Sequence, residues 1–295
     1  MKKLIFLTLF LTQTVFAQFG FSDQYQFNLL AINPAFTGER GNFGVTAMLG
    51  NQFIGGFRPQ QVSQIISMDG KLGTGHSSIG FQGYRNTITS TTNNGLNLSY
   101  AYSVETDALK INIGLNGGFS VTPNFIGSQD FTNQISPFAG IGFTALADNY
   151  FISLSSPTLF AKPQYLNAIT SPLNIMAGYR IGNADNIAFN ISALTGLQLK
   201  SGSSNFFHLN GKLWLGNKIG IGSSFRFYKG YDLGILPTAE LKVSESSTIG
   251  ISYNNKPLRL INSSSQFNNP NGIFQLMYRY DVFGQGEKNP LLNLF

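Results

Sequence analysis

The chain has 295 residues, no cysteine, a formal net charge of +6 and only 11% charged residues. Soluble domains usually carry more than twice that share of charge, whereas this chain has 27 phenylalanines, 12 tyrosines and 33 glycines. The lack of cysteine excludes disulfides. The basic residues form no cluster along the sequence, so we expect no nucleic-acid partner despite the positive charge.

The N-terminus has the three parts of a secretory signal peptide. Lys2 and Lys3 precede an apolar run from Leu4 to Phe16, and a small residue follows at Ala17. We expect residues 1–17 to be removed on export, which lowers the formal charge from +6 to +4. The alternative, an N-terminal membrane anchor, needs about 20 apolar residues in a row.

The rest of the sequence holds no apolar run of the length that a membrane-spanning helix requires. An exported chain that is poor in charge and rich in aromatic residues can still enter a membrane as a closed β-barrel, since a barrel satisfies every backbone group in lipid. We therefore predict an all-β, transmembrane outer-membrane β-barrel. The alternative is a soluble β-sandwich or β-repeat protein, which would expose many more charges on its outer faces.

Period-2 alternation supports this prediction. In LKINIGLNGG, Leu109, Ile111, Ile113 and Leu115 alternate with polar residues and glycine. We expect about 14 antiparallel strands, an even number as in bacterial single-chain barrels. The predicted ranges are 43–51, 60–69, 76–85, 95–104, 108–119, 136–145, 149–156, 172–182, 186–200, 205–216, 218–228, 234–243, 247–255 and 272–283.

Charged residues follow the alternation. The large apolar residues define the outer face of each strand, and the charges then fall on the opposite, lumen face, as expected because a charge facing lipid is costly. The exception is Arg85, which lies near a strand end, where it could reach the lipid headgroups. The predicted basic lumen residues are Lys110, Arg180, Lys200, Lys212, Arg226, Lys242 and Arg279, with Glu240 and Asp281 as acidic neighbours. A positive lumen would favour anions or an acidic peptide; lumen filling with cross-lumen pairing is the alternative.

The predicted connections alternate in length. The connections after the even-numbered predicted strands are mostly tight turns. Three connections after odd-numbered strands are predicted as long loops: 120–135, 157–171 and 256–271. Outer-membrane barrels have short periplasmic turns and long extracellular loops. We therefore expect both the N-terminus and the C-terminus in the periplasm.

Catalytic and metal-binding patterns are lacking. The two histidines, His76 and His208, lie far apart, no G-x-S-x-G motif is present, and no carboxylate cluster completes a ligand set. We expect no enzyme activity, no cofactor and no metal.

One short stretch, QYQFNLLAINPAFTG, fits neither a helix nor a strand. The stretch contains Gln-Tyr, then a second aromatic residue with asparagine, then Asn-Pro-Ala followed by an aromatic residue and a glycine. The residues are Gln24, Tyr25, Phe27, Asn28, Asn33, Pro34, Ala35, Phe36 and Gly38. Together they resemble the N-terminal signature of the PorP/SprF family of type IX secretion system membrane proteins of Bacteroidetes. We divide the chain into a signal peptide (1–17), this signature segment (18–42), the barrel (43–283) and a C-terminal tail (284–295). Whether Phe283 or Phe295 ends the barrel-assembly signal stays open.

The resemblance implies an outer-membrane component of the secretion and gliding apparatus. It implies protein partners, namely other type IX secretion components and the C-terminal sorting domain of a secreted surface protein such as an adhesin, in addition to outer-membrane lipid. The alternative function is a hydrophobic small-molecule transporter of the fatty-acid-channel type.

The signature segment is also the candidate docking or plug element. Irregular backbone is tolerated at membrane depth only inside protein or a water-filled lumen. We predict that Phe27, Leu29, Leu30, Ile32 and Phe36 pack at or in the periplasmic mouth of the barrel.

Overall fold

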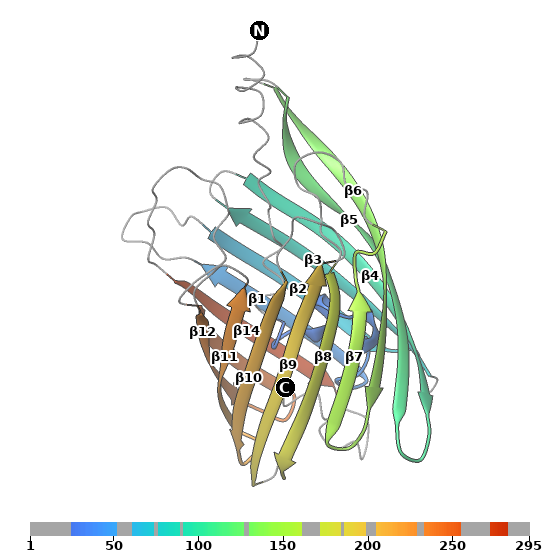
Figure 1. Cartoon of the computed structure of the whole chain (residues 1–295), viewed down its shortest axis with the longest axis vertical. Coiled ribbons are helices and arrows are strands. Elements are labelled where there is room, and N and C mark those ends of the chain that lie inside the picture. The colour runs from blue at the N-terminus through green and yellow to red at the C-terminus, as the bar shows by residue number, and fades with distance from the viewer. Residues whose placement is uncertain are drawn as a thin grey trace.

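A computed structural model describes residues 25–51, 61–73, 76–88, 91–126, 130–160, 172–183, 186–198, 205–228, 233–254 and 272–282. The described strands close into one antiparallel barrel in which each strand pairs with its sequence neighbours and the first pairs with the last. The first seven are β1 (Phe43–Asn51), β2 (Gln61–Lys71), β3 (Ser77–Ile88), β4 (Thr91–Glu105), β5 (Lys110–Ile126), β6 (Asp130–Leu146) and β7 (Tyr150–Ser156). The others are β8 (Pro172–Gly182), β9 (Ile187–Gln198), β10 (Phe206–Leu215), β11 (Ile219–Tyr228), β12 (Gly234–Lys242), β13 (Ser247–Asn254) and β14 (Ile273–Val282). The predicted fourteen-stranded barrel is confirmed (Figure 1).

Short turns gather at one end of the barrel, the lower end in Figure 1. The hairpin between β10 and β11 is typical: Gly216 and Asn217 adopt left-handed φ angles of 56° and 51°, which a tight reversal requires. Phe43 pairs with Val282, so the start of β1 and the end of β14 lie at this same end. By the rule for outer-membrane barrels, this is the periplasmic end.

The hairpin of β5 and β6 corrects one prediction. Residues 120–135 were expected to form a loop, but the two strands stay paired from Val121 opposite Ile135 to Ile126 opposite Asp130. Figure 1 shows this hairpin extending beyond the other strands. Beyond the membrane neither face must be apolar, so the alternation that marks a strand weakens there.

Proline is tolerated in this hairpin because β6 is an edge there. β7 pairs with β6 only as far as Ser156 opposite Ile141. The carbonyl of Ala139 accepts a hydrogen bond from the backbone N–H of Phe160 at 3.0 Å, on the β7 side of β6. Pro137 lies two residues before Ala139, so its backbone nitrogen also faces the β7 side. Proline has no N–H group there, so no donor is left unpaired, and the open edge is less able to pair with another chain.

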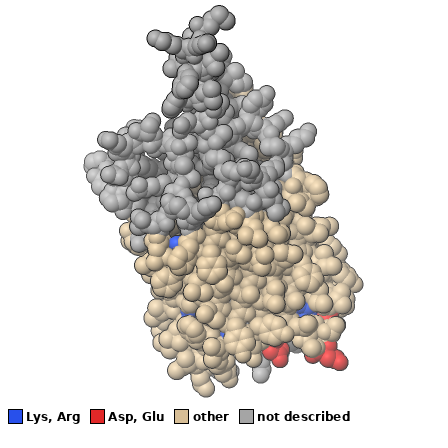
Figure 2. All heavy atoms as spheres, in the orientation of Figure 1, with Lys and Arg blue, Asp and Glu red and all other residues tan. Residues whose placement is uncertain are grey.

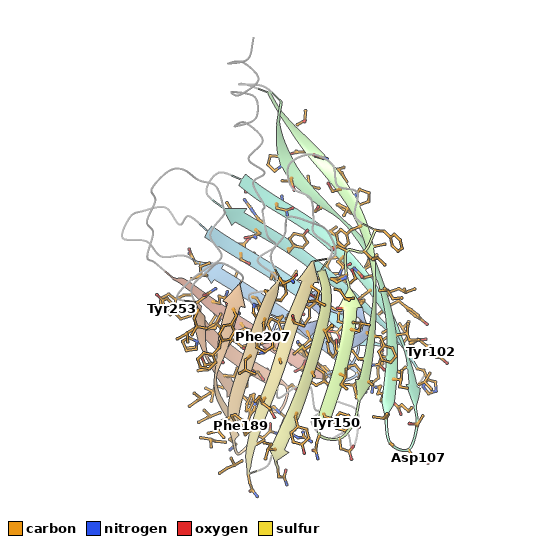
Figure 3. The ribbon with its side chains drawn as sticks, in the orientation of Figure 1. Tyr102, Asp107, Tyr150, Phe189, Phe207 and Tyr253 are labelled. Carbon is orange, nitrogen blue, oxygen red and sulfur yellow. The ribbon has the colours of Figure 1, made fainter. Side chains whose placement is uncertain are left out.

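The outer wall is apolar. Outward positions such as Leu98, Ile113 and Leu115 are more than half exposed, while the alternating residues between them are buried in the lumen. Figure 2 shows a side face almost free of charged atoms, with acidic residues at its lower end. Outward aromatic residues, including Tyr102 and Tyr150, lie toward that end (Figure 3), where barrels carry an interfacial girdle. In the described segments no helix is long and apolar enough to cross a membrane.

A charge on this wall should be costly. Leu98 lies in the middle of β4 and is 59% exposed on the outer face, so we expect Leu98→Arg to lower the free energy of unfolding by about 2 to 4 kcal/mol. Val243→Arg, on an exposed residue at the turn after β12, should cost about 1 kcal/mol or less. Urea unfolding in lipid vesicles measures both; equal costs would contradict the assignment of this face to lipid.

Candidate functional site

Residues 25–42 run through the barrel lumen, where Figure 1 shows the dark blue start of the described chain inside the ring of strands. The segment contains two short 3₁₀ turns, η2 (Leu29–Ala31) and η3 (Pro34–Phe36), joined by irregular backbone. Its apolar side chains are buried: Tyr25, Phe27, Leu29, Leu30, Ile32 and Phe36 are all at most 6% exposed. We call residues 25–42 the lumen segment.

The lumen segment bridges opposite walls. Tyr25, Leu29, Ile32 and Phe36 form one apolar cluster with side chains from β6, β7, β8 and β9: Leu146, Phe151, Met176 and Leu194. Phe27 packs in a second cluster with side chains from β1, β2, β3 and β14: Met48, Ile65, Tyr84 and Met277. The segment therefore fills the space between two sides of the barrel and does not merely line one of them.

Asn33 ties the segment to β6 and β7. Its side chain is fully buried, and its Oδ1 accepts from the N–H of Ala35 at 2.8 Å, which caps the turn that Pro34 begins. Its Nδ2 donates to Ser153 Oγ at 2.7 Å and to the carbonyl of Phe143 at 3.2 Å. An Asn-Pro pair thus supplies both the local turn and the wall contact.

Two glycines make room for this turn. Gly114 of β5 and Gly142 of β6 lie opposite each other in register and face the lumen. A Cβ on Gly114 would overlap the backbone of Pro34 and Ala35, and one on Gly142 would overlap the side chain of Asn33. The close approach of the segment to the wall is possible only because both positions lack a side chain.

Three further backbone groups of the segment also bond to the wall. The carbonyl of Ala35 accepts from Asn112 Nδ2 at 3.2 Å, and that of Ile32 accepts from Ser155 Oγ at 2.6 Å. Gly38, at a φ of 75°, donates its N–H to Asp69 Oδ2 at 2.7 Å. Bonds to β2, β5 and β7 therefore replace the hydrogen bonds that a helix or strand would provide.

Two charges of the segment are neutralised inside the lumen. Glu39 Oε1 lies 2.9 Å from Lys110 Nζ. Burial raises the pKa of the Glu39 carboxyl above its ordinary value, and the Lys110 ammonium opposes that rise. Burial also lowers the pKa of the Arg40 guanidinium.

Arg40 lies in a buried network of cations and carboxylates. Its guanidinium donates to Thr46 Oγ1 and to the carbonyl of Phe27, both at 2.9 Å. Arg279 Nε lies 2.9 Å from Asp281 Oδ2, and Lys212 pairs with Glu240. The electrostatic neighbours of Arg40 within this network are Arg279, Asp281, Asp69 and Glu240.

The first described residues of the segment contact the wall formed by β10 and β11. The ring of Tyr25 stacks on His208 with centroids 5.7 Å apart, and its hydroxyl pairs with Asn210. Gln26 Nε2 donates to Asn210 Oδ1 at 2.6 Å and to Ser224 Oγ. His208 therefore acts as a packing partner of the segment in this structure.

A family model described as "Type IX secretion system membrane protein PorP/SprF" matches residues 15–280, which cover the lumen segment and nearly the whole barrel. The chain belongs to the PorP/SprF family. No curated protein matches the sequence.

Solved structures similar to this PorP/SprF protein are outer-membrane barrels. The Acinetobacter baumannii outer membrane protein Omp33 is 13% identical with a TM-score of 0.50, and the match covers 83% of this chain and 100% of that one. The CymD monoaromatic hydrocarbon channel is 10% identical with a TM-score of 0.48, covering 88% and 99%. Outer membrane phospholipase A from Escherichia coli is 10% identical with a TM-score of 0.41, covering 82% and 91%. The family and the Omp33-like fold place the protein in the outer membrane.

The structure brings the family signature together inside the barrel. The described signature residues are all buried: Tyr25, Phe27, Asn28, Asn33, Pro34, Ala35, Phe36 and Gly38. Gln24 lies outside the described residues, as do the predicted signal peptide, the C-terminal tail, Phe283 and Phe295. The segment lies inside the lumen, and Asn33 bonds to Ser153, the central residue of β7, and to the carbonyl of Leu154 beside it.

The predicted basic lumen residues separate into two groups. Lys212, Arg226 and Arg279 are buried in the lumen, at most 6% exposed. Lys110, Arg180 and Lys242 have the same inward orientation but lie at the short-turn rim and are partly exposed. Lys200 lies outside the described residues.

Several residues of the site were not predicted from the sequence. Gly114, Gly142, Asp69, Glu39 and Arg40 all contact or accommodate the lumen segment. One signal was present: two charges directly follow a buried apolar signature, and charges at the end of a buried segment need partners. The glycines gave no such signal, because their alternation fits any strand.

Proposed function

We propose that this PorP/SprF protein acts in type IX export by protein–protein contact, assisting the export or surface anchoring of a cargo adhesin and not conducting solutes. The observation that supports the proposal is the lumen segment, which lies inside the barrel and bonds to β1, β2, β5, β6, β7, β10 and β11. We expect a barrel whose lumen holds such a segment to act through its outer surfaces. The role proposed is binding and not catalysis.

A hydrophobic small-molecule transporter would need a continuous apolar path through the barrel. The lumen-facing side chains on the described strands are mostly polar, among them Asn97, Asn116, Ser120, Asn190 and Asn210. An apolar solute would have to cross this polar wall as well as displace the lumen segment. The polar lumen therefore supports the protein-binding proposal over the transporter.

The β5–β6 hairpin is the described element best placed to meet a partner. It projects past the rest of the barrel at the end opposite the short turns (Figure 1) and exposes apolar residues, such as Ile135, which is 62% exposed. The partners proposed by family analogy are type IX machinery subunits and the C-terminal sorting domain of a cargo protein. Loop 256–271 and most of loop 157–171, also proposed as contacts, lie outside the described residues.

Gene deletion tests the proposal. We expect the deletion strain to lose one or a few large adhesins from the cell surface, while other outer-membrane proteins stay at normal levels. Protease shaving of intact cells followed by mass spectrometry measures surface display. Normal display of every surface protein would contradict the proposed role.

Planar-bilayer recording separates the proposal from the transporter. The purified intact protein should show no steady conductance if the lumen segment stays bound to the wall of the barrel, as its contacts with both sides favour. A strain complemented with Ile135→Ser, which removes an exposed apolar side chain from the hairpin, should retain the folded barrel yet display less adhesin. Steady conductance or uptake of hydrophobic solutes by the intact protein would favour the transporter.

A further inference from the structure

Arg85 is the one charged side chain that faces outward among the described strand residues. Outward positions along β3 alternate as Ile79, Phe81, Gly83 and Arg85, and Arg85 is exposed. Its side chain makes no hydrogen bond or ion pair to any other described residue. A basic residue facing lipid at mid-membrane would cost about 2 to 4 kcal/mol, so its position needs a physical reason.

The neighbours of Arg85 are also polar. In register with it lie Gln64 on β2 and Asn94 on β4, both exposed on the same outer face. Elsewhere the outer wall is predominantly apolar, so this cross-strand row of amide, guanidinium and amide is a local exception. Its members offer several N–H donors side by side and a single positive charge.

The height of the row matches the outer membrane interface. With strands tilted by about 40°, the rise from Ser77 at the short-turn end to Arg85 is about 20 Å along the membrane normal. The apolar band of such barrels is about 25 Å tall, and the long side chain of arginine can cover the remaining distance. The Oγ1 atoms of Thr87 and Thr92, just beyond the row, are 3.0 Å apart, so the outer surface has already turned polar there.

We propose that Gln64, Arg85 and Asn94 form a binding site for the phosphate group of an outer-leaflet lipid. Arginine binds phosphate through two parallel N–H donors, which are strongest where water is scarce, as at a lipid interface. The flanking amides donate to the remaining phosphate oxygens.

The surface below the row suits an acyl chain. Gly83 lies next to Arg85 on the outer face, toward the membrane centre, between Ile66 and Leu96. A Cβ on Gly83 would meet Leu96 and Ile66 at ordinary distances of 3.5 and 3.7 Å. The fold therefore tolerates a side chain there, and the apolar side chains of Ile66, Phe81 and Leu96 around Gly83 form an apolar surface in line with the phosphate site.

Native mass spectrometry of the full-length protein in lipid nanodiscs tests the site. The lipid probes are monophosphoryl lipid A, its dephosphorylated form and phosphatidylglycerol. We expect Arg85→Gln to retain about tenfold less phosphorylated lipid than the unaltered protein, Arg85→Lys to retain an intermediate amount, and Gly83→Leu to weaken retention without loss of the charge. Lys218→Gln, which removes one charge from an exposed turn at the opposite end, is the matched control and should bind normally.

The lipid arms identify the source of the phosphate. If Arg85→Gln loses only monophosphoryl lipid A, the site binds the phosphate monoester of a glycolipid. If it loses phosphatidylglycerol equally, the site also binds a phosphodiester headgroup. Heat-dependent gel mobility confirms that each variant is folded. Equal retention by Arg85→Gln and Lys218→Gln, or equal binding of the dephosphorylated lipid, would overturn the proposal.

Discussion

Gly114→Val should displace the lumen segment and lower the free energy of unfolding by about 3 kcal/mol. The added side chain would enter the space occupied by the backbone of Pro34 and Ala35. That backbone cannot shift freely, because Asn33 holds it from one side and the bond from Asn112 to the Ala35 carbonyl holds it from the other. The variant must therefore either strain the turn or release the segment.

Gly117→Val is the matched control for this prediction. It lies on the same strand but faces outward, and the atom nearest to an added Cβ is the carbonyl oxygen of Phe138 at 3.9 Å. Its free energy of unfolding should change by at most about 0.5 kcal/mol. The chain has one tryptophan, Trp214, which is buried in the lumen, so its fluorescence reports unfolding in urea. The same urea midpoint for both variants would contradict the packing described for the lumen segment.

Arg40→Met should lower the free energy of unfolding by about 3 to 5 kcal/mol, the usual cost of removing one partner from a buried ion network. The substitution removes a buried cation that interacts with the carboxylates of Asp281, Asp69 and Glu240. It also removes the donors to Thr46 and to the carbonyl of Phe27. Urea unfolding in lipid vesicles measures the loss.

A double-mutant cycle separates charge balance from simple loss of packing. Asp69→Asn should recover part of the stability lost in Arg40→Met, because the two charges interact within one network. Lys218→Met, at an exposed turn, is the control and should change stability by about 0.5 kcal/mol or less. Strictly additive effects of Arg40→Met and Asp69→Asn would show that their charges are not coupled.

The barrel was predictable because lipid imposes one simple rule on the sequence. Outward residues must be apolar and lumen residues are free to be polar, so strands such as β1 and β8 were located to the residue. The prediction was wrong at 120–135, where the hairpin extends beyond the other strands and the rule need not apply.

The lumen segment was predictable only in outline. Its apolar residues, together with Asn33-Pro34, indicated a buried irregular segment, because such backbone is allowed only inside protein. The partners of Asn33 are Ser153 and Phe143, more than one hundred residues away in the sequence. No local pattern encodes contacts at that separation.

By itself, the sequence determined the class of the protein: an exported, lipid-embedded barrel with a recognisable family signature. These properties follow from composition, from period-2 alternation and from a short motif, all of which are local. The tertiary structure alone decided that the signature lies in the lumen, that Gly114 and Gly142 make room for it, and that Arg40 lies among the carboxylates of distant strands. Those features depend on closure of the barrel, which brings distant strands around one segment and removes water from the groups between them.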